Sequence, residues 1–96
     1  MEPIALPKFE RTYKKFTKKF QERIKREVKL ILNAPDTGAL KKGDLAGIRI
    51  HKFKEEKEIY LLAYAVDSNE DKLYIYAIGT HEEFYKRLKK YLQVIE

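Results

Sequence analysis

The sequence contains no cysteine and no tryptophan, and only three prolines, four glycines and one methionine among its 96 residues. Without cysteine there is no disulfide framework, no thiolate zinc site and no thiol nucleophile. No apolar run approaches the roughly 20 residues that span a bilayer, so we expect no transmembrane helix. Residues 1–7 lack the basic flank and long apolar stretch of a secretory signal, which favours a cytoplasmic protein.

The chain does contain enough apolar surface to build one core. Hydrophobic residues make up 44% of the sequence, including seven Tyr and five Phe, a composition that argues against disorder. Single cores of about 100 to 150 residues are the commonest size. We therefore expect residues 1–96 to form a single domain.

Positive charge is concentrated in the first half of the chain. Residues 1–54 hold 15 Lys or Arg and 6 Asp or Glu, a balance of +9, whereas residues 55–96 hold 6 and 9, a balance of −3. The excess is densest over residues 8–29. Such a run suits a polyanion, because neutralised phosphates release counterions, although a solvated helix face has the same composition.

Apolar residues from Phe9 to Ile31 recur every three or four positions, with Lys and Arg between them. This spacing predicts helical structure with one buried face. Thr17 is suited to cap a second helix, which would divide the pattern into helices over 8–16 and 18–33. The periodicity by itself fits one long helix equally well.

The second half of the chain has the patterning of strands. A loop rich in Pro, Gly, Asn and Asp over residues 33–44 is followed by three β-branched or aromatic segments, at 46–53, 58–66 and 72–78. The segment at 58–66 is apolar at almost every position, which predicts a central strand covered on both faces. A final helix is expected over 81–93. The order predicts an α+β domain with helices packed on an antiparallel sheet.

A few polar residues stand in or beside these apolar segments. Arg49 and His51 lie two positions apart in the first main strand, so their side chains share one face, which either lines a cleft or is the exposed side of the sheet. His81 follows the last strand, and Tyr85 lies one helical turn further on. We predict that these four residues meet in one cleft. The alternative is that Arg49 and His51 belong to the solvated face of the sheet and that His81 is only the first residue of a helix.

The chemistry of this group suits RNA cleavage without a metal, in which the 2′-hydroxyl attacks the adjacent phosphate. An imidazole with a pKa near 6.5 acts as general acid or base at neutral pH, Arg binds phosphate through its planar fork, and Tyr stacks on a base. Lys52 and Lys54 would lie at the rim. Phosphate loops, GxSxG and HExxH motifs are absent, and two histidines are too few for a zinc site without help from carboxylates, so no cofactor is expected.

Five groups of residues occur in a characteristic order along nearly the whole chain: PKF (7–9), NAP (33–35) with TG (37–38), LKKGDLAGIR (40–49), YLLAY (60–64) and IGTHEEFY (78–85). Together they resemble the RelE/ParE superfamily of toxins from type II toxin–antitoxin systems. The resemblance implies a helical hairpin packed on a mostly antiparallel sheet of about four strands, with a short first strand over Ile4–Leu6 and a C-terminal helix.

The resemblance also implies a function. Many members of the superfamily are mRNA interferases that cleave mRNA on the ribosome and inhibit translation, and each is held inactive by a cognate antitoxin. Arg49 and His51 match basic positions on the first long strand of RelE-like enzymes, His81 matches an Arg or His at the end of the last strand, and Tyr85 matches a following aromatic. Leu61 departs from RelE-like enzymes, which commonly have Arg there, although the YafQ-like branch tolerates an apolar residue at this position.

The sequence therefore predicts a toxin that is a metal-independent endoribonuclease, with a cognate antitoxin, mRNA and ribosomal RNA as partners and no membrane. The predicted catalytic residues are Arg49, His51, His81 and Tyr85. The predicted RNA-binding residues are Lys52, Lys54, Lys18, Lys19, Lys25 and Arg26. The alternatives are a ParE-like inhibitor of DNA gyrase and a catalytically inactive toxin fold that only binds its antitoxin.

Overall fold

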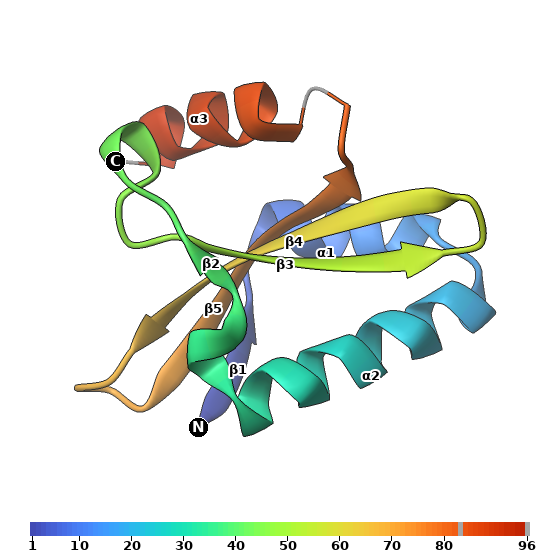
Figure 1. Ribbon diagram of the computed structural model, residues 1–96, viewed down its shortest axis with the longest axis horizontal. Helices are drawn as coiled ribbons and strands as arrows, with labels where there is room; N and C mark the ends of the chain where they lie inside the picture. Colours follow the sequence, from blue (N-terminus) through green and yellow to red (C-terminus); the bar gives the residue numbers. More distant parts are fainter. Residues whose placement is uncertain (83, 96) are drawn as a thin grey trace.

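The computed structural model describes residues 1–82 and 84–95 and shows one mixed sheet with helices on both faces (Figure 1). The elements are β1 (Glu2–Ala5), α1 (Pro7–Lys15), α2 (Lys18–Asn33), β2 (Ala39–Leu40), β3 (Arg49–Glu55), β4 (Glu58–Asp67), β5 (Lys72–Thr80) and α3 (Phe84–Ile95), with 3-10 turns at Pro35–Thr37 and Gly43–Leu45. The sheet order is β1-β5-β4-β3-β2, in which only β1 and β5 run parallel. No helix in the described residues has the length and apolar character to cross a membrane.

The predicted α+β class is confirmed, with differences in the number of strands and in the bounds of several elements; β1, for example, spans Glu2–Ala5 rather than residues 4–6. The sheet has five strands rather than about four, because the two-residue segment β2, which lies in the predicted loop, also pairs with β3. The first main strand begins at Arg49 rather than at residue 46, since Gly43 and Gly47 adopt positive φ angles of 65° and 87° and turn the chain there. The last helix begins at Phe84 rather than at residue 81.

The first two helices form a hairpin, which resolves the two interpretations that the periodicity allowed. Thr17 is extended, and its hydroxyl accepts a hydrogen bond of 3.2 Å from the amide of Phe20, which caps α2. The side-chain amide of Gln21 donates to the carbonyl oxygens of Tyr13 and Phe16. The Tyr13 carbonyl also accepts from the amide of Phe16, and together these bonds give partners to carbonyls at the end of α1 and hold the turn between the helices.

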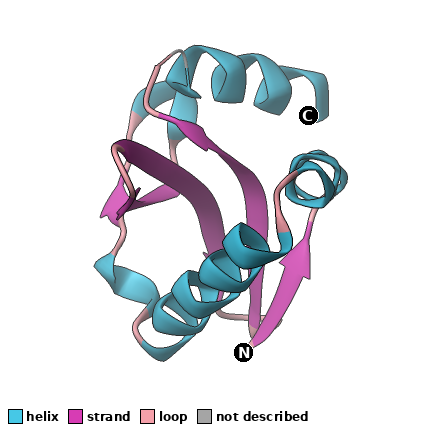
Figure 2. Cartoon of the chain, turned by 90° about the vertical axis from the view of Figure 1, so that its right-hand side faces the viewer, coloured by secondary structure: helices cyan, strands magenta, loops and turns pink. Residues whose placement is uncertain are grey.

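Helices lie on both faces of the sheet (Figure 2), and an apolar cluster lies between the sheet and the helices on each face. The first, packed by α1 and α2, contains Phe9, Phe20, Ile24, Ile31, Phe53, Leu62, Tyr64, Leu73, Ile75 and Ile78. The second, packed by α3, contains Leu45, Ile48, Ile50, Leu61, Ala63, Ala77, Phe84 and Leu88. Because β4 contributes fully buried residues to both clusters, the prediction of a central strand covered on both faces is confirmed.

Alternation along β3 decides which side chains face which helices. Phe53 belongs to the first cluster and Ile50 to the second, so odd-numbered residues of β3 face α2 and even-numbered residues face α3. An irregularity at Ala63 and Tyr64 shifts the register between β4 and β5. Past this point the strands pair regularly to their ends, which brings the exit of β5 beside the β3–β4 hairpin.

Candidate active site

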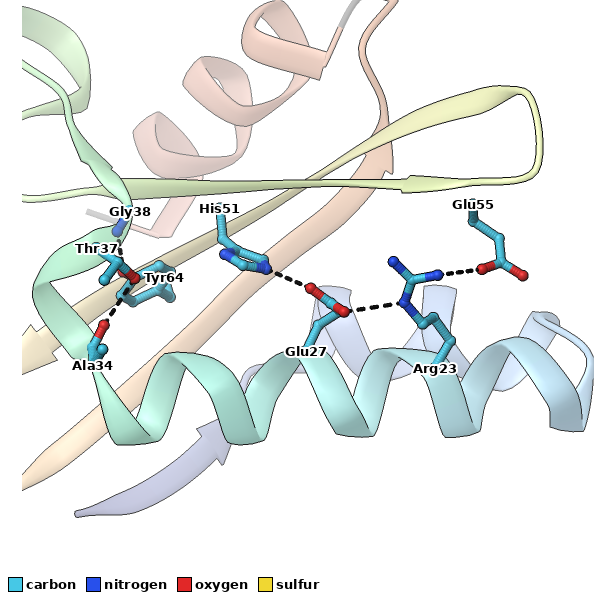
Figure 3. A network of polar contacts seen from close by, with 8 residues as sticks. All are labelled: Arg23, Glu27, Ala34, Thr37, Gly38, His51, Glu55 and Tyr64. Atoms are coloured by element: carbon cyan, nitrogen blue, oxygen red, sulfur yellow. Dashed lines mark hydrogen bonds and ion pairs between the residues drawn. The ribbon is translucent and has the colours of Figure 1, made fainter.

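Arg49 and His51 face α2 and the loop that precedes β2. Nε2 of His51 lies 2.7 Å from Oε1 of Glu27 in α2 (Figure 3). The guanidinium of Arg49 donates to the carbonyl oxygens of Asp36 and Gly38, at 2.9 and 2.8 Å. Both residues therefore join the sheet to neighbouring elements of the protein.

Glu27 is the centre of a chain of ion pairs between α2 and β3. Nε of Arg23 lies 3.0 Å from Glu27 Oε2, and Nη1 of Arg23 lies 2.7 Å from Glu55 Oε1. Glu27 is only 8% exposed. Burial by itself raises the pKa of Glu27, but the hydrogen bonds from His51 and Arg23 and the charge of Arg23 outweigh burial, so the pKa lies below its ordinary value. Because ionised Glu27 only accepts, His51 donates from Nε2–H.

Tyr64 of β4 holds the loop before β2 from within the core. Its hydroxyl donates to the carbonyl of Pro35 at 2.6 Å and accepts from the amide of Gly38 at 3.0 Å. Burial raises the pKa of the Tyr64 hydroxyl, which stays neutral and able to donate. A Cβ atom on Gly38 would lie 2.5 Å from this hydroxyl, so the close approach requires glycine.

Replacing Tyr64 with Phe is expected to lower the free energy of unfolding by about 1–3 kcal/mol, because a buried amide and a carbonyl lose their partner. Urea denaturation measures the change. Tyr60→Phe, on the same strand, is the matched control and is expected to stay within about 0.5 kcal/mol. Equal midpoints for the two variants would mean that the Tyr64 hydroxyl does not stabilise the loop.

The opposite face of the sheet carries Lys52, Lys54 and His81. The two lysines are exposed, even-numbered residues of β3 on the α3 side. Lys54 is paired with Ile59 of β4, and the amide of His81 donates to the carbonyl of Ile59 from the other side, at 3.2 Å. Lys54, Ile59 and His81 therefore lie in one row across the three strands.

The neighbouring row consists of Lys52, Leu61 and Gly79. Leu61 is fully buried in the second cluster, and a Cβ on Gly79 would lie 3.3 Å from the ring of Phe84. The floor beneath the exposed side chains is therefore apolar, at the position where the RelE-like resemblance would place an arginine.

Tyr85 lies beside these rows on α3. Its ring centroid is 6.2 Å from that of His81, with the rings nearly perpendicular at 84°. The ring also has Nζ of Lys41 5.3 Å from its centroid. Tyr85 is half-buried against the second cluster, whereas His81 is exposed. We call Lys52, Lys54, His81 and Tyr85 the α3-face group.

The structure divides the four residues that were predicted to share a cleft. Arg49 and His51 lie on the face packed by α2, and His81 and Tyr85 lie on the face packed by α3, with β4 between them. The physical reason is the alternation of side chains along β3, which instead places the predicted rim residues Lys52 and Lys54 with His81. Sequence reasoning missed Lys41, because a lysine in a loop has no periodicity that assigns it a neighbour.

The other predicted RNA-binding residues lie elsewhere, exposed on α2: Lys18, Lys19, Lys25 and Arg26. Nζ of Lys25 is 3.5 Å from a carboxylate oxygen of Glu22, and both side chains are largely exposed, so this pair is solvated and adds little stability. In the described ranges, 1–82 and 84–95, no three His, Asp or Glu side chains are grouped to hold a metal ion.

The helical hairpin, mixed sheet and C-terminal helix together define a RelE-like fold. The chain is similar to a double mutant of the E. coli RelE toxin in the free state, with a TM-score of 0.75 and 15% identity over 97% of this chain and 96% of that one. It is also similar to a chain of the intact E. coli RelBE toxin–antitoxin complex, with a TM-score of 0.69 and 17% identity over 84% and 96%. A conserved hypothetical protein of Helicobacter pylori, HP0892, has a TM-score of 0.55 and 20% identity over 86% and 97%.

The family follows from the sequence match. Residues 4–89 match the profile of the ParE-like toxins of type II bacterial toxin–antitoxin systems. The chain belongs to this family, and the RelE/ParE resemblance is confirmed. No curated protein matches the sequence.

Proposed function

We propose that this toxin is a metal-independent endoribonuclease that cleaves mRNA on the ribosome and thereby inhibits translation. The observation that carries the proposal is the α3-face group, in which two lysines, an imidazole and a tyrosine ring gather at the end of the sheet. Exposed cations attract the phosphate backbone, and an aromatic ring beside them stacks an unpaired base.

The chemistry needs one group to remove a proton and another to supply one. The 2′-hydroxyl loses its proton and attacks the adjacent phosphorus, and the 5′-oxygen leaves with a proton, which gives a 2′,3′-cyclic phosphate and a 5′-hydroxyl. His81 exchanges one of these protons, and Lys54, in the same row, exchanges the other. Lys52 stabilises the charge that develops on the phosphate, and Tyr85 stacks against the neighbouring base.

The proposal includes two partners besides mRNA. A cognate antitoxin is supported by the family description and by the similarity to a chain of the RelBE complex. The exposed cations of α2 lie on the other side of the sheet from the α3-face group. We assign them to docking on ribosomal RNA, which would weaken steeply as salt is raised.

A second candidate, a ParE-like inhibitor of DNA gyrase, is favoured by one observation. Leu61 gives the α3-face group an apolar floor in place of a fixed guanidinium, and a gyrase inhibitor needs no nuclease residues. A toxin fold that acts only by binding its antitoxin is compatible with the same floor.

A cleavage assay tests the proposal. Purified protein is incubated with a defined mRNA, either free in EDTA or on translating ribosomes in Mg²⁺, and new 5′ ends are mapped by primer extension. We expect discrete cuts on ribosomes only, and cleavage by His81→Ala slower by about 10²- to 10⁴-fold, the usual contribution of a general acid or base. Glu82→Ala, an exposed neighbour, is the control and should cleave as wild type does. Absence of cuts by the wild type would contradict the proposal, and a supercoiling assay with DNA gyrase would follow.

A further inference from the structure

Lys41 reaches the α3-face group from the loop after β2. Its backbone amide donates to the carbonyl of Ile48 at 2.9 Å, and Ile48 is buried in the second cluster. The backbone of Lys41 is therefore fixed to the core. Its half-buried side chain extends across to α3, where the ammonium lies 5.3 Å from the ring centroid of Tyr85.

The ammonium of Lys41 lies over the ring of Tyr85, and the face of an aromatic ring is the surface on which an RNA base stacks. The rings of His81 and Phe84 also contact the Tyr85 ring and are nearly perpendicular to it, at 84° and 87°. The tyrosine side chain also packs against the second cluster. A cation over a ring face and a base stacked on the same face exclude each other, so a stacked base displaces the ammonium.

We propose that Lys41 is a phosphate-binding residue of the α3-face group, which covers Tyr85 in the free protein and moves to the RNA backbone when a base stacks on that ring. This inference rests on the proposed function. The displaced ammonium stays tethered beside Tyr85 by a flexible four-carbon stem, within reach of the phosphate that follows the stacked base. Lys41 would thus add a positive charge to the α3-face group, in which Leu61 supplies an apolar surface and no charge.

The chain contains a matched control for this contact. Lys8 of α1 lies over Tyr91, also on α3, with the same 5.3 Å between ammonium and ring centroid. Both lysines are half-buried, and both join α3 to another element. Removing either charge weakens the packing of α3 in a comparable way, but only Lys41 lies over the ring beside His81.

The experiment compares Lys41→Met, Lys41→Arg and Lys8→Met in single-turnover cleavage on ribosomes programmed with a defined mRNA. Met keeps the length of the stem and removes the charge. We expect Lys41→Met to cleave about tenfold or more slowly, the usual effect of losing a charged hydrogen bond. Lys8→Met should match wild type, and Lys41→Arg should recover most of the rate. Thermal melting should show similar shifts for the two Met variants.

Equal rates for Lys41→Met and Lys8→Met, with an active wild type, would overturn the role of Lys41 and leave the proposed nuclease intact. If the wild type itself does not cleave, the proposed nuclease activity is wrong. The phosphate contact of Lys41 is then tested by measuring how binding to the same ribosomes depends on salt. A fall of about one in the slope of log K against log salt for Lys41→Met, with none for Lys8→Met, would support the phosphate contact. Equal slopes would overturn it.

Discussion

The double variant Lys52→Met/Lys54→Met is expected to cleave ribosome-bound mRNA at least about 10³-fold more slowly than wild type, since one electrostatic donor alone contributes about 10²- to 10³-fold. Both positions are exposed, so the loss of charge leaves the core unchanged. His51→Gln, on the other face of the same strand, is expected to cleave within about threefold of wild type, because the amide of Gln still donates to Glu27 as His51 does.

This comparison distinguishes two locations of the site with residues of one strand. If catalysis depended on the face of His51, as the group predicted from the sequence requires, His51→Gln would lose most of its activity. The single-turnover rate on programmed ribosomes is the measurement, and far-UV circular dichroism confirms that each variant is folded. An active lysine double variant would contradict the assignment of catalysis to the α3 side.

Replacing Glu27 with Gln is expected to lower the free energy of unfolding at pH 7 by about 1.5–3 kcal/mol, because the buried carboxylate that accepts from Arg23 and His51 loses its charge, although Arg23 keeps its pair with Glu55. Arg23 and His51 both depend on this carboxylate, and Glu27 is buried between them. Urea denaturation measures the loss. Glu22→Gln is the matched control on the same helix, because its pair with Lys25 is exposed, and it should cost less than about 0.5 kcal/mol.

The difference between wild type and Glu27→Gln is expected to depend on pH. The folded state holds the pKa of Glu27 below its ordinary value, so the unfolded chain takes up the proton first as the pH falls. The stability from this group is complete above the unfolded pKa, about 4.3, and is lost as the pH falls through the folded value. Urea denaturation at several acidic pH values should show the free energies of unfolding of wild type and Glu27→Gln approaching each other as the pH falls. A difference between the two proteins that does not depend on pH would mean that the loss comes from packing.

Local patterns were sufficient for most of the secondary structure. The 3–4 spacing of apolar residues predicted helical structure over the first third of the chain, because one helical face must be buried whatever covers it, whereas the break at Thr17 was left open by the spacing and was shown by the structure. The continuous apolar run of β4 identified the central strand for the same reason. Boundaries were less accurate where glycine turned the chain, as at Gly47, since a glycine is compatible with several conformations.

The candidate site was only half predictable. Alternation showed that Arg49 and His51 share a face, and equally that Lys52 and Lys54 share the other, but a period of two does not tell which face a helix will cover. His81 lies opposite Ile59 only because the irregularity at residues 63 and 64 shifts the register of β5.

Contacts between distant segments were decided by the tertiary structure alone. Glu27 meets His51 across 24 positions of sequence, and Lys41 meets Tyr85 across the junction between a loop and α3. The periodicity of the sequence shows which side of a helix or strand is apolar, because that side is recorded in the spacing of neighbouring residues and must be buried in any fold. The partner of a charged side chain depends instead on register and helix placement, which are set by the packing of the whole chain.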